Sequence, residues 1–223
     1  MTGLFPRLAY LLALGGGFFL MLRLNLPGHL SVDSVLGLHE GRFGLRETWN
    51  PAIYGWLLGL ADKITPGTSA IVVMNGALLF GAWASLLALR TRVSWLAPLA
   101  AALAIALPQA LVYPAIVWKD VLFATFTIAG FAVLALAARN RLERPLIALA
   151  VSALLFAAAG LFRQNGLILA VFAGLSIALV AWPADWRRAA GLGSGWLAGV
   201  AALTFVLSIV AQPTGVGPPD SAG

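Results

Sequence analysis

Two basic residues, Lys119 and Arg163, each lie beside polar residues at the end of a long apolar stretch. Lys119 is followed by Asp120, and Arg163 is followed by Gln164 and Asn165. An arginine binds a phosphate through a bidentate fork, and a lysine binds it as a point charge. The two positions therefore predict a phosphate-binding site at the depth where the apolar stretches end. In the alternative interpretation, both side chains only extend toward water from the membrane, and Lys119 and Asp120 form a local ion pair that ends the helix.

A second group of polar residues lies in segment 27–68, which contains both histidines and four of the eight acidic residues. We expect a helix at Ser31–Leu38, with Ser31 as its N-cap. On this helix Asp33 and Glu40 share one face, because residues seven apart lie on the same side. The opposite face is apolar and is formed by Val32, Val35 and Leu36. This pattern predicts an amphipathic helix that lies at the membrane interface.

Residues 49–58 are expected to form a second short helix in this segment. Pro51 suits its first turn, where the missing N–H of a proline has no helical partner to lose. Trp49 and Tyr54 are of the residue types that gather at the boundary between membrane and water. They either anchor the segment at that boundary or contact a bound substrate.

Composition determines the kind of protein that holds these residues. Hydrophobic residues make up 61% of the 223 residues, charged residues make up only 10%, and the mean hydropathy is +0.94. A soluble domain carries about 25% charged and 45–50% apolar residues, so a soluble globular enzyme and a disordered chain are both excluded. The chain has no cysteine, which excludes disulfides, zinc–thiolate sites, iron–sulfur clusters and a cysteine nucleophile.

Seven stretches are long and apolar enough, or nearly so, to cross a membrane as helices, for which roughly 20 residues are needed. They are Leu4–Leu26, Ser69–Leu89, Ser94–Tyr113, Val121–Ala138, Pro145–Phe162, Gly166–Trp182 and Ala189–Ala211. We therefore predict an all-α fold, a polytopic transmembrane helix bundle formed by residues 1–211. Residues 212–223 are expected to be a flexible tail.

The distribution of basic residues predicts the orientation of this bundle. The connectors on one side hold eight arginines and two acids, whereas those on the other side hold six bases and six acids. The first side carries the whole net charge of +6 and is expected to be cytoplasmic. This places the N-terminus inside, segment 27–68 outside and, after seven crossings, the C-terminus outside. The arginines occupy short connectors and form no continuous patch, so nucleic acid is excluded as a partner.

Five short motifs follow one another along the chain. They are Ser31-Val32-Asp33-Ser34, Glu40-Gly41-Arg42-Phe43, Trp49-Asn50-Pro51-Ala52-Ile53-Tyr54, Trp118-Lys119-Asp120-Val121-Leu122-Phe123 and Phe162-Arg163-Gln164-Asn165-Gly166-Leu167. Their order resembles the GT-C superfamily of integral-membrane glycosyltransferases, which includes the protein O-mannosyltransferases and the lipid A aminoarabinose transferases. The resemblance extends from about Leu4 to Ala211. Many relatives have an acidic pair where this chain has Asp33 alone, and His-Pro where it has Asn50-Pro51.

The resemblance implies a transfer reaction and assigns roles to these residues. Enzymes of that superfamily take a sugar from a polyprenyl-phosphate donor and pass it to an acceptor outside the cytoplasmic membrane. Asp33 would match their acid in the first outer loop, as a general base toward the acceptor hydroxyl or as a ligand of a divalent metal such as Mg²⁺ or Mn²⁺. Glu40 is the second candidate catalytic acid, about 10.5 Å along the helix from Asp33. Lys119 and Arg163 would hold the lipid phosphate and stabilise the leaving group.

The resemblance also implies substrate contacts and partners. The other residues of the motifs that would bind substrate are Trp49, Asn50, Tyr54, Asp120 and Asn165. The implied partners are a polyprenyl-phosphate sugar donor, an acceptor that is a lipid, a glycan or a protein, and the lipids of a bacterial inner membrane. Enzymes of the superfamily continue beyond seven spans, so this chain is expected to be a truncated sequence, a minimal core that needs a partner subunit, or an inactive relative.

Two other classes of function stay open on the sequence. A small-solute or lipid transporter would carry polar or ionisable groups near the middle of its spans, where this chain offers Asn75 as its only strongly polar residue. A non-catalytic accessory membrane protein would leave Asp33, Lys119 and Arg163 apart from one another, facing lipid or solvent. The glycosyltransferase interpretation requires these three side chains around one cavity that opens outward.

Overall fold

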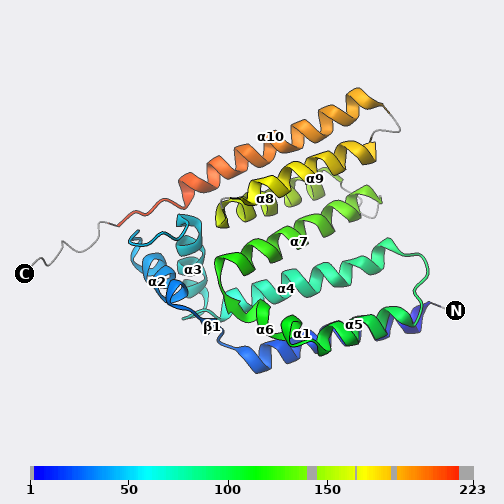
Figure 1. Cartoon of the computed structure of the whole chain (residues 1–223), viewed down its shortest axis with the longest axis horizontal. Coiled ribbons are helices and arrows are strands. Elements are labelled where there is room, and N and C mark those ends of the chain that lie inside the picture. Colours follow the sequence, from blue (N-terminus) through cyan, green and yellow to red (C-terminus); the bar gives the residue numbers. More distant parts are fainter. Residues whose placement is uncertain (1–2, 140–144, 164, 182–184, 216–223) are drawn as a thin grey trace, which may run out of the picture.

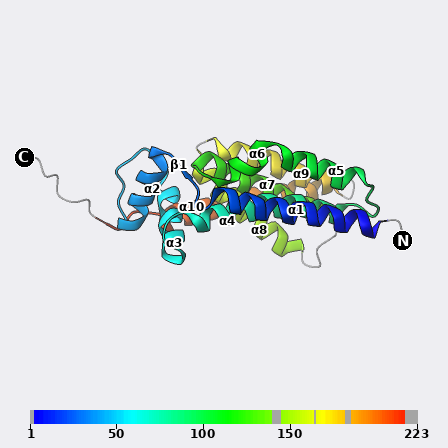
Figure 2. The ribbon, with the colours of Figure 1, turned by 90° about the horizontal axis from the view of Figure 1, so that it is seen from below.

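The computed structural model describes residues 3–139, 145–163, 165–181 and 185–215. Within these residues the chain is almost entirely helical, and its long helices lie side by side in one bundle (Figure 1). Two short helices, α2 (Val32–Phe43) and α3 (Ala52–Ile64), lie together at one end of the bundle. The view from below shows the same elongated bundle, with the N-terminus at the opposite end (Figure 2). We call these two regions the α2–α3 end and the N-terminal end.

Five helices in the described part of the chain are long and apolar enough to cross a membrane. They are α1 (Leu4–Asn25), α4 (Ser69–Ser85) with the 3-10 turn η1 (Leu86–Leu89), α7 (Lys119–Ala138), α8 (Pro145–Phe162) and α10 (Trp186–Val210). Helix α9 (Gly166–Ala181) is also apolar, but it has only 16 residues. This set of helices indicates a multi-pass membrane protein.

The predicted span Ser94–Tyr113 is not one straight helix. Its residues form α5 (Leu96–Ala106) and α6 (Pro108–Val112), followed by the turn η2 (Tyr113–Ala115), and the two parts meet at a bend of 75°. Pro108 has no N–H to continue the helix, and the residue before a proline is disfavoured in the helical region. Leu107 is accordingly extended, with ψ of 126°. The bent pair, counted as one span, brings the candidate spans among the described residues to six, where the sequence predicts seven.

The bounds of the other predicted spans agree with the helices to within three residues. Helix α8 has the predicted bounds, and α9 begins at Gly166 and packs against α8. The pair Asn165-Gly166 at this point is of a type that favours turns. Trp182, the predicted end of its span, lies outside the described residues. Long apolar runs bounded by charges or prolines are therefore sufficient to place most of these helices.

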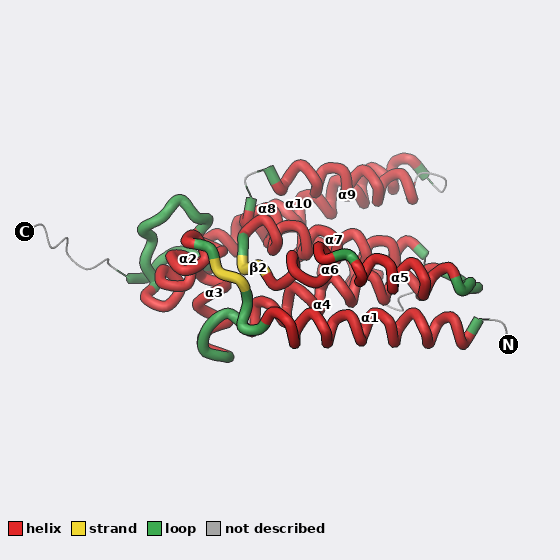
Figure 3. The backbone as a smooth tube through the Cα atoms, turned by 60° about the horizontal axis from the view of Figure 1, so that its bottom comes forward, coloured by secondary structure: helices red, strands yellow, loops and turns green. Residues whose placement is uncertain are grey.

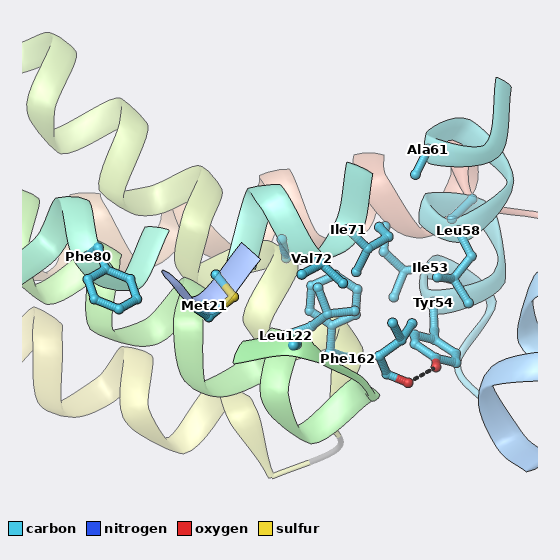
Figure 4. Close-up of a cluster of buried hydrophobic side chains, with 14 of the residues drawn as sticks. Met21, Ile53, Tyr54, Leu58, Ala61, Ile71, Val72, Phe80, Leu122 and Phe162 are labelled. Carbon is cyan, nitrogen blue, oxygen red and sulfur yellow. Dashed lines mark hydrogen bonds between the residues drawn. The ribbon is translucent and has the colours of Figure 1, made fainter. Parts of the chain in front are cut away.

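Buried apolar side chains run through the bundle in two clusters. The larger cluster joins α1, α4, α7 and α8 and continues into α3, where Ile53, Tyr54 and Leu58 pack on the end of the bundle (Figure 4). The smaller cluster joins α7, α8, α9 and α10 around Phe156 and Trp196, whose ring centroids are 5.3 Å apart. Because α3 shares the core of the bundle, the residues next to it are held in fixed positions.

Helix α2 begins where the sequence predicts and continues past Leu38 to Phe43. Ser31 and Ser34 form a reciprocal capping box at its start, and Gly44 ends it with φ of 66°, the left-handed conformation that favours glycine. Its predicted apolar face is confirmed: Val32, Val35 and Leu36 are exposed on the surface of the protein.

Helices α2 and α3 cross with their backbones in contact at Gly41. A Cβ atom at this position would collide with the carbonyl oxygen of Gly55 and would lie 2.6 Å from the backbone nitrogen of Gly59. Only a residue without a side chain permits this approach. The pair of helices therefore depends on glycine at the crossing.

Two short strands connect segment 27–68 to the start of α7. Strand β1 (His29–Leu30) pairs in parallel with β2 (Ile116–Val117), so that His29 lies opposite Ile116 and Leu30 opposite Val117 (Figure 3). The chain leaves β1 directly into α2 and leaves β2 directly into α7. This pairing brings the first turns of α2 and α7 together.

The described residues after α10 return to α2. The N–H of Gly215 donates to the carbonyl oxygen of Gly44 at 2.8 Å, so the first residues of the predicted tail are packed against the end of α2. The rest of the predicted tail, residues 216–223, lies outside the described residues.

Candidate functional site

Asp33, Asn50 and Lys119 meet at the α2–α3 end. The Nζ atom of Lys119 donates to Oδ1 of Asn50 at 2.9 Å and lies 3.6 Å from Oδ2 of Asp33. The side-chain nitrogen of Asn50 donates in turn to the backbone carbonyl of Asp33 at 3.2 Å. Asn50 is buried, whereas the side chain of Asp33 is 49% exposed. The amide thus fixes the lysine beside a carboxylate that solvent or a substrate can reach.

Each of these three residues lies at the start of a helix. Asp33 is in the first turn of α2, Asn50 precedes the N-cap Pro51 of α3, and Lys119 is the first residue of α7. The helix starts are tied together at the carbonyl oxygen of Val117, which accepts hydrogen bonds from the hydroxyls of Ser34 and, at 3.0 Å, Tyr54. The dashed bond at Tyr54 in Figure 4 is this contact. The geometry of the cluster is therefore imposed by buried hydrogen bonds next to it.

Tyr54 is buried, and its role is structural. It is fully inaccessible to solvent, and this burial raises the pKa of its phenol to about 12. The hydroxyl therefore keeps its proton, and its bond to the Val117 carbonyl, throughout the neutral range. Trp49 is the opposite case, since it is fully exposed. Neither aromatic ring lines the cavity that Lys119 and Arg163 share.

A cavity of about 330 Å³ lies beside the cluster and is lined by Pro51, Lys119, Asp120, Phe162, Arg163 and Asn165. Its size lies within the range of small-molecule sites, about 300–1,000 Å³. Four residues that the sequence predicts as substrate-binding therefore share one cavity, although they come from two separate connectors. Arg163 and Asp120 form an ion pair across it.

The local ion pair between Lys119 and Asp120, one of the sequence-based alternatives, is wrong. Lys119 faces Asp33, and Asp120 faces Arg163. Consecutive residues of a helix point in different directions and do not face each other. The two adjacent charges therefore connect α7 to two other parts of the molecule instead of to each other.

Glu40 lies away from this cavity. Its Oε1 atom accepts the backbone N–H groups of Glu47 at 2.7 Å and Thr48 at 2.6 Å, and the residue is only 4% exposed. It thus holds the loop that leads to Asn50. Glu40 also borders a separate cavity of about 320 Å³ between α2, α3 and the residues after α10. The basic residues of that cavity are Arg42, Arg46 and Lys63.

Arg42 and Asp62 link α2 to α3 through a bidentate ion pair. Nε and Nη2 of Arg42 donate to the two carboxylate oxygens of Asp62 at 2.8 and 2.7 Å, and the N–H of Gly67 donates to Asp62 at 2.6 Å. The hydrogen bond from Arg42, followed by that from Gly67, lowers the pKa of Asp62 to about 2. The pair stays charged above that pH.

The residues around Asp33 do not fit a resident divalent metal. Such ions are held by several carboxylate or imidazole ligands, and in the described ranges no three His, Asp or Glu side chains gather at one point. The ammonium of Lys119 already occupies the position beside Asp33 that a cation would take. Asp33 is therefore a carboxylate with a lysine partner.

Sequence reasoning missed three contributors to this site. Ser34 donates to the Val117 carbonyl, and Pro51 and Phe162 form walls of the cavity. The sequence predicts Ser31 as the helix N-cap, but no local pattern reveals that Ser34 has a partner so far along the chain. Pro51 and Phe162 are of residue types that occur throughout the chain, so their type does not mark them as walls of a cavity.

Asn75, the polar residue within a predicted span, is engaged in helix packing. It is fully buried, and its Oδ1 accepts the hydroxyl hydrogen of Thr125 at 2.9 Å, which joins α4 to α7. Among the described residues its amide nitrogen has no partner. Asn75 therefore contributes to the packing of α4 against α7.

Comparison with known proteins identifies no relative. No protein-family model matches the sequence, and neither a curated protein nor a solved structure matches it significantly. The resemblance to GT-C enzymes therefore rests on the short motifs and their order along the chain.

Proposed function

We propose that this chain is a membrane glycosyltransferase that moves a sugar from a polyprenyl-phosphate donor to an acceptor hydroxyl. The observation that carries the proposal is that Lys119 connects the carboxylate of Asp33 to the cavity of Arg163. Lys119 lies 3.6 Å from Asp33 and lines one cavity with Arg163, whereas Asp33 is not among the residues that line this cavity. A non-catalytic accessory protein has no need of this arrangement, because its charged residues only have to reach water.

In the proposed topology, the bent pair α5–α6 and the shorter helix α9 also cross the membrane, which gives seven spans. The N-terminal end then faces the cytoplasm of a bacterial cell, and the α2–α3 end faces outward. A polyprenyl phosphate carries its phosphate at the membrane surface and its tail in the hydrocarbon. The cavity lies where α7 begins and α8 ends, which is the level that such a phosphate occupies.

The two cations of the cavity have donors left for a phosphate. Lys119 has three ammonium protons; one is donated to Asn50 and another faces Asp33. Arg163 uses Nη1 for Asp120, which leaves the N–H groups of Nη2 and Nε. One phosphate oxygen would accept a hydrogen bond from the third proton of Lys119, and a second oxygen would accept from Arg163.

The proposed reaction is a direct displacement. Asp33 takes the proton of an acceptor hydroxyl as the hydroxyl oxygen forms a bond to the anomeric carbon. The bond between that carbon and the phosphate oxygen breaks, and its electron pair leaves with the polyprenyl phosphate. Lys119 and Arg163 stabilise the added negative charge on the leaving group. The displacement inverts the configuration at the anomeric carbon.

The acceptor in this proposal is a lipid, a glycan or a protein with a free hydroxyl outside the membrane. The exposed carboxylate of Asp33 is the point at which the acceptor meets the donor. A partner subunit that supplies part of the acceptor site is compatible with the open surface around α2.

Transfer of radiolabel from a polyprenyl-phosphate sugar, in membranes that contain the full chain, tests this function. We expect wild-type membranes to transfer the sugar and Asp33→Asn to lower the rate by about 10²–10⁴-fold, the usual contribution of a general base. The substitution keeps the size of the side chain and removes its charge.

Glu47→Gln is the matched control for charge loss in the same segment. Glu47 is exposed, and the one side-chain ion pair it makes among the described residues is to His39, at 3.9 Å. Membranes that contain Glu47→Gln should transfer the sugar at the wild-type rate. A rate that is equally low for both variants, or unaffected by Asp33→Asn, would reject the assigned role. A wild-type chain that neither transfers sugar nor binds the donor would favour an accessory protein.

A further inference from the structure

The N-terminal end of the bundle contains a cavity that the proposed function does not use. It has a volume of about 670 Å³ and is lined by Tyr10, Leu86, Leu87, Arg90, Arg92, Val93, Ser94 and Ala97. These residues come from α1, from the turn η1 that follows α4, from the connector that leads into α5, and from the first turn of α5. The cavity thus lies between three apolar helical segments at one surface of the bundle.

The connector that forms this cavity is fixed by an arginine on α1. The Nη2 atom of Arg7 donates to the carbonyl oxygens of Arg90 and Thr91, at 2.6 and 3.0 Å. The hydroxyl of Tyr10, one turn further along α1, donates to the carbonyl oxygen of Trp83 at 2.8 Å. Arg7 therefore positions the backbone that carries Arg90, and its own charge is bound to neutral oxygens.

Positive charge at this cavity is not neutralised by the described part of the chain. Arg90 and Arg92 are exposed, and no carboxylate in the described ranges forms an ion pair with Arg7, Arg90 or Arg92. Three cations at the α2–α3 end differ in this respect, since Arg42, Lys119 and Arg163 each face an aspartate. The cavity therefore combines two positive charges, those of Arg90 and Arg92, with apolar walls.

The chemistry of the walls indicates what the cavity holds. Leu86, Leu87, Val93 and Ala97 suit hydrocarbon, and the two arginines at the same cavity suit a phosphate. Trp95, which follows the cavity residues, is 64% exposed, as expected for a tryptophan at head-group depth. A ligand with a phosphate next to acyl chains satisfies both sets of walls, whereas a free phosphate satisfies only the arginines.

We propose that this cavity is a binding site for the head group of an anionic phospholipid, with the phosphate at Arg90 and Arg92 and the first acyl carbons on the leucines. Basic pockets between membrane helices are known to bind such head groups. The site is independent of the glycosyltransferase proposal, because it lies at the opposite end of the bundle. It would fix α1, α4 and α5 relative to one another in the membrane.

Native mass spectrometry of the purified full chain, in a neutral detergent, tests this site. The chain is titrated with phosphatidylglycerol, with phosphatidylcholine and with inorganic phosphate, and bound ligands are counted. We expect phosphatidylglycerol to bind in preference to the other two. Each basic residue near a membrane surface changes the affinity for anionic lipid about fivefold, so Arg90→Gln/Arg92→Gln should weaken binding about thirtyfold.

The matched control removes two arginines from the same end of the molecule. Arg187→Gln/Arg188→Gln takes away equal charge from the start of α10, outside this cavity, and should leave binding unchanged. Ser94→Glu places a negative charge in the cavity without touching an arginine and should weaken phosphatidylglycerol binding. Equal losses in both double variants would show a diffuse charge effect and overturn the proposal. So would equal binding of the two lipids, or saturation by inorganic phosphate alone.

Discussion

The two ends of the bundle both carry basic residues, but they hold them in different ways. At the α2–α3 end, Lys119 lies 3.6 Å from Asp33, and Arg42 and Arg163 pair with Asp62 and Asp120. At the N-terminal end, Arg7 donates to two backbone carbonyls, and Arg90 and Arg92 border an apolar cavity. The three ion pairs at the α2–α3 end join separate segments, whereas the ion pair found among the described residues at the N-terminal end, Arg188 with Asp185, lies within one segment.

This difference matches the two roles that we propose, a catalytic site at the α2–α3 end and a lipid-binding site at the N-terminal end. Charge pairs and buried hydrogen bonds fix side chains in place before a substrate arrives, which is what transition-state stabilisation requires. Cations without a carboxylate partner retain their capacity to attract an anion and to orient the protein in the membrane. The proposed reaction site at the α2–α3 end relies on the first property, and the proposed lipid site at the N-terminal end relies on the second.

The largest loss of stability at the α2–α3 end is expected from a substitution of Gly41. A methyl group there would collide with backbone atoms of α3, which cannot rotate away. We expect Gly41→Ala to lower the free energy of unfolding by about 3 kcal/mol, the upper end of overpacking costs. Thermal unfolding in detergent, together with proteolysis of segment 27–68, measures this loss.

Gly81→Ala on α4 is the control for this substitution. A Cβ atom at Gly81 meets nothing within 4 Å, and alanine in a helix is favoured over glycine by about 0.5–1 kcal/mol. Gly81→Ala should leave stability unchanged or slightly raised. A Gly41→Ala chain as stable as the wild type would show that α2 and α3 are not in backbone contact.

A smaller effect is expected at the Val117 carbonyl, which ties both helices to α7. Ser34→Ala or Tyr54→Phe alone leaves the other hydroxyl as a donor, so each should cost about 0.5–1.5 kcal/mol. The double variant removes both hydroxyl donors from a buried oxygen and should cost more than the sum of the two. Unfolding of the four chains in a double-mutant cycle measures this coupling. Additive costs would mean that the two hydroxyls act independently.

The smallest effect is expected from the Arg42–Asp62 ion pair, through the dependence of stability on pH. Because the folded pKa of Asp62 is lowered to about 2, its contribution to stability is present above the unfolded value and is lost as the pH falls from about 4 toward 2. The pair lies at the surface, where the Arg42 side chain is 46% exposed and that of Asp62 is 17% exposed, so solvent weakens it and the effect is small. Asp62→Asn should reduce the loss of melting temperature between pH 5 and pH 2.5 by about a degree or two. An identical loss in both chains would contradict the pairing.

Local sequence patterns predict where the helices begin and end better than they predict which distant residues come into contact. Pro145 and the charge of Arg163 bound α8 within the sequence itself, and Ser31 marks the start of α2. The proximity of Asp33 to Lys119 depends instead on two-residue strands and on the glycine crossing of α2 and α3. These are contacts between distant segments, which no spacing along the chain reveals.

Glu40 illustrates the same limit within the candidate site. Its spacing from Asp33 correctly predicts that both lie on one helix, but its partners are backbone N–H groups of a loop. Backbone groups are available at every residue, so the residue types give no signal for this bond. The bend at Pro108 is the reverse case, because the residue that causes it is a proline and is recognisable in the sequence itself.

The most direct test compares the two lysines of the chain, both of which lie at the α2–α3 end. Lys119 lines the candidate cavity and Lys63 lines the separate cavity near Arg46. We expect Lys119→Gln to weaken the binding of a polyprenyl phosphate about tenfold or more, because a hydrogen bond to a charged group contributes about 1.5–3 kcal/mol. Lys63→Gln should bind as tightly as the wild type, with equal helicity in all three chains. Equal affinities for the two variants, or a greater loss in Lys63→Gln, would contradict the assignment of the donor phosphate to Lys119.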